Sequence, residues 1–355
     1  MSKSRNNMES MLKRLFDAVG ALNHAVAQRA QKVDRIEKDY PGEKLKTEAY
    51  NTRKQRLATV NQEFEKEWVS ALKNLDDLCK RVRQRQPHLN ELTVENINTG
   101  THFPDALAFG RMYLTYQNWK GYIPRLIPFP FKKSLWLPDQ TTGHRLIHQL
   151  MLRLMHCMPV GNVEITAADP LRLGTSLDPF LSLLKVKRLF PEQRLLTRSD
   201  ELENALARLT DYVEDLLQNK FKGEIKSWSA YNSANSSNPI PYKLLLIFGV
   251  PEQLTDKSLW YLGRLLEHGP VCGVLPVLTI DEDRLKDRKF TGLRTAIDKY
   301  SKRMDSIVPA EILTKHVSEI SVVEEQEFWP GRSELANFLA SISDRHDMSS
   351  KFSKS

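Results

Sequence analysis

The chain has 355 residues, of which 41% are hydrophobic and 27% charged, so it can bury at least one sizeable core. Its formal net charge of +8 favours an anionic partner such as nucleic acid. Its three widely spaced cysteines exclude a disulfide framework and a zinc cluster, and no apolar run approaches the roughly 18 residues of a membrane span. The N-terminus lacks the apolar core of a signal peptide. We therefore expect a soluble, cytoplasmic protein that does not bind membranes.

Residues 8–86 predict an antiparallel helical hairpin, or coiled coil. In the first half, apolar residues recur at intervals of three and four with Arg29 as the only break, which is the pattern of a supercoiled helix pair. Pro41 and Gly42 then end the helix, and a second amphipathic pattern continues as far as Pro87. The hairpin either covers its own seam or binds a protein partner or a second copy of the chain. We favour the assembly role.

Basic residues cluster near the end of the second predicted helix. They are Lys80, Arg81, Arg83 and Arg85. Cations at this end complement the negative end of the helix dipole, and this structural role is the favoured interpretation. The alternative is contact with DNA or another anion, made by this chain directly or through its complex.

The rest of the chain predicts an α/β fold. Residues 88–133 are rich in Gly, Pro and aromatic residues, which indicates short strands and extended connections. Beyond them, apolar strands alternate with amphipathic helices. The strands are expected at 134–137, 163–169, 242–250 and 272–280, and the helices at 144–158, 200–221 and 256–269. This alternation predicts a largely parallel sheet covered on both faces.

These patterns divide the chain into four expected parts. They are a helical hairpin at 1–87, a β-rich connecting segment at 88–133, an α/β domain at 134–345 and a disordered tail at 346–355. Two segments near the end, IVPAEILTKHV and SELANFLASIS, are expected to pack back as a strand or helix and as a closing helix.

The turn after the first apolar strand is where a phosphate-binding loop would lie. Such a loop needs glycines whose neighbouring amides wrap the phosphates, a lysine for the terminal phosphates and a hydroxyl for magnesium. Here Pro138 and Gly143 take the two glycine positions, His144 takes the lysine position and Arg145 takes the hydroxyl position. Proline lacks the N–H that the loop would donate. Asp139 adds a negative charge beside the phosphate path, so the loop is degenerate.

Three short motifs follow this turn in order. Asp169-Pro170 ends the second apolar strand, Trp228–Asn232 follows a long helix, and Leu278–Ile280 ends the last strand. In this order they resemble the motor domain of the FtsK/SpoIIIE family of DNA translocases, which carries an Asp-Pro pair, a Gly-Tyr-Asn-like segment and a strand ending in Thr-Gln. The resemblance covers about residues 100–280 and implies a P-loop-NTPase fold.

The resemblance also places the family's Walker B strand at 242–250, where Phe248 and Gly249 take the positions of the two acids. ATP hydrolysis needs the lysine, the magnesium ligands and a polarised water together. The lysine, the hydroxyl, the Walker B acid and the catalytic acid are all substituted here. The chain therefore resembles the non-catalytic FtsK-like domain found ahead of active motor domains in some large bacterial proteins. This implies a pseudo-ATPase with no catalytic residue and no cofactor, in a DNA-associated complex linked to DNA translocation or phage defence.

Other functions stay open. An active, DNA-stimulated ATPase with an unusual or subunit-completed site requires Lys132 or Lys133, together with Glu252, to lie at the turn. A coiled-coil scaffold with no ligand in the α/β domain predicts an exposed apolar stripe on the hairpin. Weak binding of ATP at the free amides near Thr141 and Thr142 is a further alternative.

Two other clusters were weighed as sites. His144 and His148 have the i, i+4 spacing of metal ligands, but the metalloprotease motif is absent, so we expect surface histidines and no metal. Asp281, Glu282 and Asp283 follow the last strand, at the edge where α/β active sites form. We interpret them as the solvated start of a helix.

Overall fold

The computed structural model describes residues 11–41, 47–93, 97, 102–306, 321–325 and 329–352. The chain forms two compact units that alternate along the sequence. Unit 1 holds Met1–Pro87, Ala108–Ile127 and Pro309–Glu327, and unit 2 holds His88–Leu107, Pro128–Val308 and Phe328–Ser355. Within the described ranges, no helix combines the length and the apolar character that a membrane span requires.

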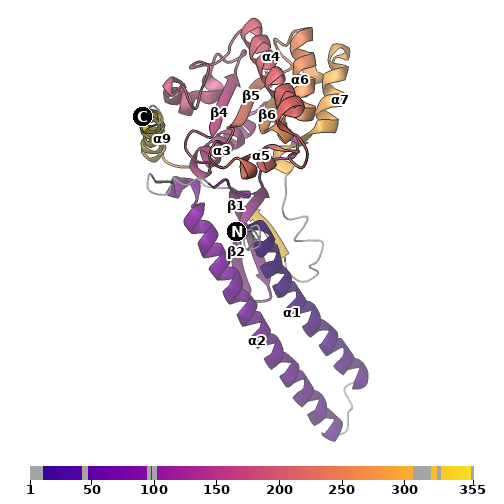
Figure 1. Cartoon of the computed structure of the whole chain (residues 1–355). Coiled ribbons are helices and arrows are strands. Elements are labelled where there is room, and N and C mark those ends of the chain that lie inside the picture. Colours follow the sequence, from indigo (N-terminus) through magenta and orange to yellow (C-terminus); the bar gives the residue numbers. More distant parts are fainter. Residues whose placement is uncertain are drawn as a thin grey trace. The chain divides into compact units, whose positions relative to one another are not determined.

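Unit 1 begins with α1 (Met11–Asp39) and α2 (Thr47–Arg85), which lie side by side as a hairpin (Figure 1). The seam predicted for the first helix is buried. Its buried members are Leu15, Val19, Leu22, Val26 and Ile36. Residues three and four apart share one face of a helix, so this face packs along α2. Of the predicted turn, Gly42 lies outside the described residues.

Arg29, the one break in the seam, is held by specific contacts. Its guanidinium lies over the ring of Phe64, 5.0 Å from the centroid. Its Nη1 donates to the hydroxyl of Tyr116 at 3.2 Å, and its Nε donates to Asn61 at 3.1 Å. A cation over an aromatic face is attracted by the ring's quadrupole. The seam therefore accommodates an arginine because its guanidinium has both an aromatic and two hydrogen-bonding partners.

A small antiparallel sheet completes unit 1. Its strands are β1 (Ala106–Tyr116), β2 (Trp119–Pro128) and β8 (Ser321–Glu325), in the order β2-β1-β8. The hairpin packs on this sheet through Trp68 of α2. The ring of Trp68 lies 5.1 Å from that of Tyr116 and 5.5 Å from that of Trp119, centroid to centroid. Aromatic pairs at such separations stabilise beyond the area they bury.

The remaining surface of the hairpin is polar. Ion pairs join its two helices, namely Lys32–Glu63 at 2.8 Å, Arg56–Asp39 at 3.6 Å and Arg53–Glu37 at 4.0 Å. In the described part of the hairpin, the exposed large apolar side chains are Tyr50 and Val69. The apolar stripe expected of a scaffold hairpin is therefore not found on the residues that the structure describes.

Unit 2 is built on a five-stranded sheet. Its strands are β3 (Ser134–Pro138), β4 (Val163–Ala168), β5 (Tyr242–Val250), β6 (Val274–Ile280) and β7 (Ser301–Arg303). They pair in parallel in the order β4-β5-β6-β3-β7. The first strand of this sheet thus lies between the last two. The carboxyl ends of strands at such a switch point are where open α/β sheets bind ligands.

Helices cover both faces of this sheet. The helices of unit 2 are α3 (Thr141–Cys157), α4 (Ser199–Asp215), α5 (Trp228–Ala234), α6 (Asp256–His268), α7 (Thr291–Tyr300) and α9 (Arg332–Phe352). The short helical turns are Leu89–Glu91, Thr175–Lys185, Leu216–Lys220, Pro270–Cys272, Arg284–Lys286, Arg288–Phe290 and Met304–Ser306. Helices α4, α6 and α7 lie together and share a core with Leu245 and Ile247 of β5 (Figure 1). Phe248 points the other way and contacts His144 of α3, so α3 covers the opposite face.

The predicted α/β fold class is confirmed: a largely parallel sheet covered by helices, preceded by an antiparallel helical hairpin. The structure differs from the predicted boundaries in three places. The α/β domain predicted at 134–345 is interrupted, because β8 belongs to unit 1. Segment 88–133 is divided between the units, since β1 pairs with β8 from late in the chain. The tail expected at 346–355 is helical as far as Phe352, because α9 continues past the predicted closing helix at 333–343. Segment 307–317 lies outside the described residues.

Replacing Trp68 with alanine should destabilise unit 1 by about 3–5 kcal/mol, because the side chain is almost fully buried among aromatic rings. Its neighbour Val69 is 63% exposed, so Val69→Ala is a matched control that should change stability by about 0.5 kcal/mol or less. Urea denaturation followed by circular dichroism measures both. Equal effects of the two substitutions would contradict the packing of α2 on the sheet.

Candidate functional site

The turn between β3 and α3 consists of only two residues, Asp139 and Gln140. Both of their amides are bonded within the protein. The amide of Asp139 donates to the carbonyl of Ile280 at 2.9 Å, and that of Gln140 donates to the carbonyl of Pro138 at 2.8 Å. A phosphate loop presents a series of backbone amides to its ligand. The two amides of this turn are therefore not available to a phosphate.

Gly143, placed by the sequence at the last glycine of a phosphate loop, lies inside the first turn of α3 and is buried. A Cβ at this position would lie 2.4 Å from the carbonyl oxygen of Pro138 and 3.3 Å from the Cβ of Leu137. The glycine thus permits the close approach of α3 to the end of β3. Its role in this structure is packing.

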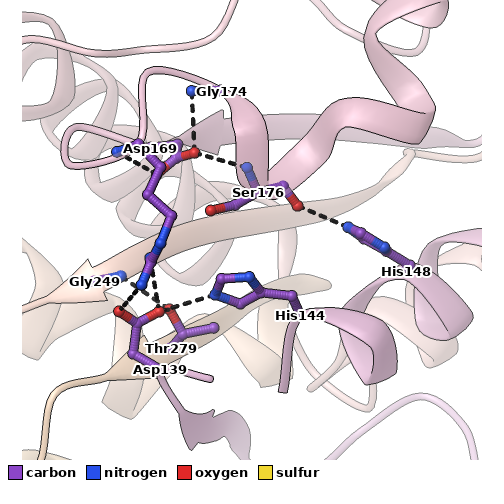
Figure 2. Close-up of polar contacts among 9 residues, drawn as sticks. Asp139, His144, His148, Asp169, Gly174, Ser176, Gly249 and Thr279 are labelled. Carbon is purple, nitrogen blue, oxygen red and sulfur yellow. Dashed lines mark hydrogen bonds and ion pairs between the residues drawn. The ribbon is translucent and has the colours of Figure 1, made fainter. Parts of the chain in front are cut away.

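The carboxylate of Asp139 is the centre of a hydrogen-bond network at the carboxyl ends of the strands (Figure 2). Arg172 holds it with two bonds, from Nη1 to Oδ1 at 3.1 Å and from Nη2 to Oδ2 at 2.8 Å. Nε2 of His144 bonds Oδ1 at 2.9 Å, and the hydroxyl of Thr279 donates to Oδ1 at 2.7 Å. A bidentate arginine on a carboxylate is among the strongest hydrogen-bonded pairs in proteins.

This network sets the charge of Asp139, whose side chain is only 9% exposed. Burial by itself would raise the pKa of Asp139. The hydrogen bonds from His144, Arg172 and Thr279 and the positive charge of Arg172 outweigh it and lower the pKa well below its ordinary value. The same ion pair raises the pKa of Arg172. Asp139 is therefore an anion at neutral pH, in the position where nucleotide phosphates were considered.

Phe248 and Gly249, the residues that the resemblance places at the Walker B acids, lie beside this network. The amide of Gly249 donates to the hydroxyl of Thr279 at 2.9 Å, and Phe248 is fully buried with its ring against His144. Gly249 has a φ of +75°, and a Cβ there would meet Cδ1 of Leu171 at 2.6 Å. An acid at this position would thus require strained backbone, displacement of Leu171 and a second carboxylate close to Asp139.

Asp169, of the Asp-Pro motif, positions the arginine. It is fully buried and accepts hydrogen bonds from three backbone amides of the loop after β4 (Figure 2). The donors are Arg172 at 3.2 Å, Gly174 at 3.0 Å and Ser176 at 3.1 Å. A carboxylate that satisfies three amides fixes the course of a loop. The loop therefore presents the side chain of Arg172 in a defined place.

Sequence reasoning did not select Arg172 or Thr279 as site residues. A signal for both exists, since each stands at the end of a predicted parallel strand, and such ends meet at one edge of the sheet. Of the selected residues, the structure brings together Pro138, Asp139, Gly143, His144, Phe248 and Gly249. Arg145 is exposed.

Lys132, Lys133 and Glu252, the residues that an active ATPase would need at the turn between β3 and α3, lie elsewhere or are already paired. Lys132 and Lys133 precede β3, at the end opposite Asp139, and Lys133 donates to the carbonyl of Lys299 at 3.0 Å. Glu252 follows β5 at the correct edge, but its carboxylate pairs with Arg284. The lysines and the acid considered for that alternative therefore do not meet.

The basic cluster of α2 belongs to unit 1, whereas the turn belongs to unit 2. Lys80 pairs with Asp76 of the same helix at 2.6 Å. Arg83 lies over the ring of Tyr122 and also donates to its hydroxyl. Arg81 and Arg85 are exposed. Two of the four cations thus have partners within unit 1, and the others face solvent.

The two histidines of α3 that were weighed as metal ligands, His144 and His148, bond different partners. His144 bonds Asp139, whereas Nε2 of His148 bonds the carbonyl of Ser176 at 2.7 Å (Figure 2). Among the residues that the structure describes, no three His, Cys, Asp or Glu side chains gather in a way that could hold a metal. Asp281 accepts bonds from the amides of Asp283 and Arg284, both at 3.1 Å, as the start of a short helix does.

No protein-family model matches the chain, and no curated protein matches its sequence. Thirty-seven chains of solved structures do match. ATPases 2 and 3 of Thermomonospora curvata EccC, in complex with a signal sequence peptide, match at 13% identity and a TM-score of 0.47, over 68% of this chain and 47% of that chain. ATPases 2 and 3 of EssC from Geobacillus thermodenitrificans match at 12% identity and a TM-score of 0.47, over 72% and 51%.

The pCW3 conjugation coupling protein TcpA, in its monomer form with ATPγS, matches at 12% identity and a TM-score of 0.42, over 77% of this chain and 86% of that chain. This chain spans about half the length of the matched EccC and EssC chains. At these identities and TM-scores the matches assign neither an activity nor a ligand to this chain.

Replacing Gly143 with alanine should destabilise unit 2 by about 1–3 kcal/mol, because the new Cβ has to displace backbone at the end of β3. Gly263, inside α6, has no neighbouring atom within 4 Å of its Cβ position. Gly263→Ala is therefore the matched control and should stabilise the protein by up to about 1 kcal/mol. Thermal unfolding of the two variants gives opposite shifts if α3 approaches β3 as described.

The contribution of Asp139 to stability should depend on pH. Because its folded pKa is lowered, the network stabilises the protein at neutral pH, and this stabilisation is lost as the pH falls below about 4. Asp139→Asn should cost about 2 kcal/mol at pH 7, and the difference from the parent chain should shrink as acid is added. Urea denaturation at several pH values measures it.

The matched control for this titration is Asp283→Asn, which removes an exposed carboxylate paired with Lys286. Because this carboxylate is exposed and screened by solvent, the substitution should leave the free energy of unfolding nearly unchanged at every pH. A cost of Asp139→Asn that stays constant from pH 7 to pH 3 would show that the charge of Asp139 does not stabilise the fold.

Proposed function

We propose that this chain is a non-catalytic, FtsK-like component of a cytoplasmic, DNA-associated assembly linked to DNA translocation or phage defence. The observation that carries the proposal is the two-residue turn between β3 and α3. The element order around it is that of a motor-type α/β fold, with a helix directly after the first strand of the sheet. The loop that would wrap a triphosphate is missing from that place.

The chemistry of the surrounding side chains supports the same proposal. ATP hydrolysis requires positive charge at the phosphates, ligands for magnesium and a group that orients water. At this edge, the position of the phosphates faces the carboxylate of Asp139, and the two Walker B positions hold Phe248 and Gly249. A triphosphate would meet like charge and would find neither metal ligand. The pseudo-ATPase therefore retains the architecture of a motor domain without its chemistry.

In this proposal the hairpin of α1 and α2 mediates assembly. Its helices are already joined to each other by ion pairs, and its described surface exposes few large apolar side chains. A protein partner or second copy would therefore be bound mainly through polar and charged contacts. The exposed Arg81 and Arg85 at the end of α2 are the groups proposed to contact DNA phosphates.

The test is ATP binding and turnover by the purified chain with magnesium, with and without duplex DNA. We expect no nucleotide binding and no turnover in either condition, because the phosphate cradle and the metal ligands are absent. ATP turnover above a no-protein control, stimulated by DNA and lost in His144→Ala, would overturn the proposal in favour of an active ATPase.

The same preparation tests the DNA contact by fluorescence anisotropy at low and moderate salt. Arg81→Gln with Arg85→Gln should weaken DNA binding and lower the salt dependence by about one phosphate contact for each cation removed. Lys54→Gln with Lys66→Gln is the matched control, since it removes equal charge from exposed positions elsewhere on α2. Equal weakening by both pairs would mean that only the net charge of the chain matters.

A further inference from the structure

The hydrogen-bond network around Asp139 joins residues at four strand ends of one sheet. Asp139 follows β3, Arg172 follows β4, Gly249 lies at the end of β5, and Thr279 lies at the end of β6. In the sheet order, β5 and β6 lie between β4 and β3, so β4 is roughly 14 Å from β3 at the usual spacing of strands. The loop of Arg172 therefore reaches over the ends of two other strands. The carboxylate of Asp139 therefore connects the loop after β4, the end of β6 and the first turn of α3.

Each donor is held in place by contacts other than the one to Asp139. The hydroxyl of Thr279 accepts from the amide of Gly249, which leaves its proton to point at the carboxylate. The loop of Arg172 is fixed by the buried Asp169, and the ring of His144 packs on Phe248. Donors arranged in advance around one point form an oxyanion site rather than a simple pair of charges.

We propose that this edge is a phosphate-type oxyanion site whose ligand is built into the chain: the carboxylate of Asp139 occupies the place of a bound oxyanion and holds the strand ends together without nucleotide. The proposal rests on the proposed function, which it deepens by naming what fills the degenerate site. Two carboxylate oxygens replace two phosphate oxygens on the guanidinium of Arg172, a geometry that arginine offers to both anions.

The proposal accounts for the two-residue turn. A longer loop would carry the carboxylate away from the donors, whereas this turn places it directly over the end of β6, where the amide of Asp139 also bonds Ile280. It further implies that the conformation of unit 2 does not respond to nucleotide, because the site has a permanent occupant. Adding ATP or ADP to the chain would therefore leave the strand ends unchanged.

Chemical rescue tests the proposal. Asp139→Ala removes the carboxylate and leaves its space, so the variant should unfold at lower temperature than the parent chain. Inorganic phosphate should then raise its melting temperature in a saturable way, and the folding equilibrium constant should grow by the factor of one plus the ratio of ligand concentration to Kd. Formate, the smaller oxyanion, should act similarly at higher concentration. Chloride at matched ionic strength should not.

Two further variants separate the site from the general stabilising effect of phosphate on proteins. Asp139→Asn fills the same space without charge, so it should be destabilised and not rescued. The double variant Asp139→Ala with Arg172→Gln lacks the principal donor and should show only the general effect, as the parent chain does. Isothermal titration of phosphate into Asp139→Ala should show one site, and none in the double variant.

Rescue confined to Asp139→Ala supports the proposal. Equal phosphate shifts in all four proteins would overturn it, and so would a failure of Asp139→Ala to refold both with and without phosphate. ATP turnover by the parent chain reports on the proposed function independently. A chain that neither binds nor hydrolyses ATP, and whose Asp139→Ala variant is not rescued, would remain a pseudo-ATPase with an ordinary ion pair at this edge.

Discussion

A nearly buried carboxylate needs hydrogen-bond and ionic partners, and in unit 2 this requirement organises the edge of the sheet where the strands have their carboxyl ends. Left without partners, the charge of Asp139 would cost several kcal/mol. Its partners are recruited from loops that belong to different strands, so satisfying one side chain fixes the relative positions of the loop after β4, the first turn of α3 and the end of β6. Here the chain carries its own anion.

Asp169 and Asp139 have different environments and different structural roles at this edge of the sheet. Asp169 is fully buried and is met by backbone amides alone, so it shapes a loop. Asp139 is met by a guanidinium, an imidazole and a hydroxyl, so it joins side chains from several elements. The first is therefore a local constraint and the second a long-range one. The second role depends on the first, because the loop fixed by Asp169 positions Arg172, which binds Asp139.

Sequence patterns predicted the parts of the fold that depend on local periodicity. The seam of α1, the continuous apolar run of β5 and the amphipathic α6 each carry a repeat that identifies the element. The partners of β1 carried no such signal, since β8 lies about two hundred residues away and no local pattern links the two strands. The site, too, was predicted only in part. Pro138 and His144 could be recognised as departures from a template, whereas Arg172 was not selected, because only the strand order brings its loop to the same edge as Asp139.

The pairing of β1 with β8 has a consequence for the order of events during synthesis. The helices α1 and α2 are made before β1 and β2, but the third strand of their sheet is made only about two hundred residues later. Until then one edge of β1 offers unpaired backbone groups, the kind of edge that recruits strands from other chains. The five strands of the unit 2 sheet are translated within this interval, and the loop that closes when β8 arrives spans them. The sheet of unit 1 is therefore completed only after those strands have been made, so chains interrupted between β7 and β8 would carry an open sheet edge.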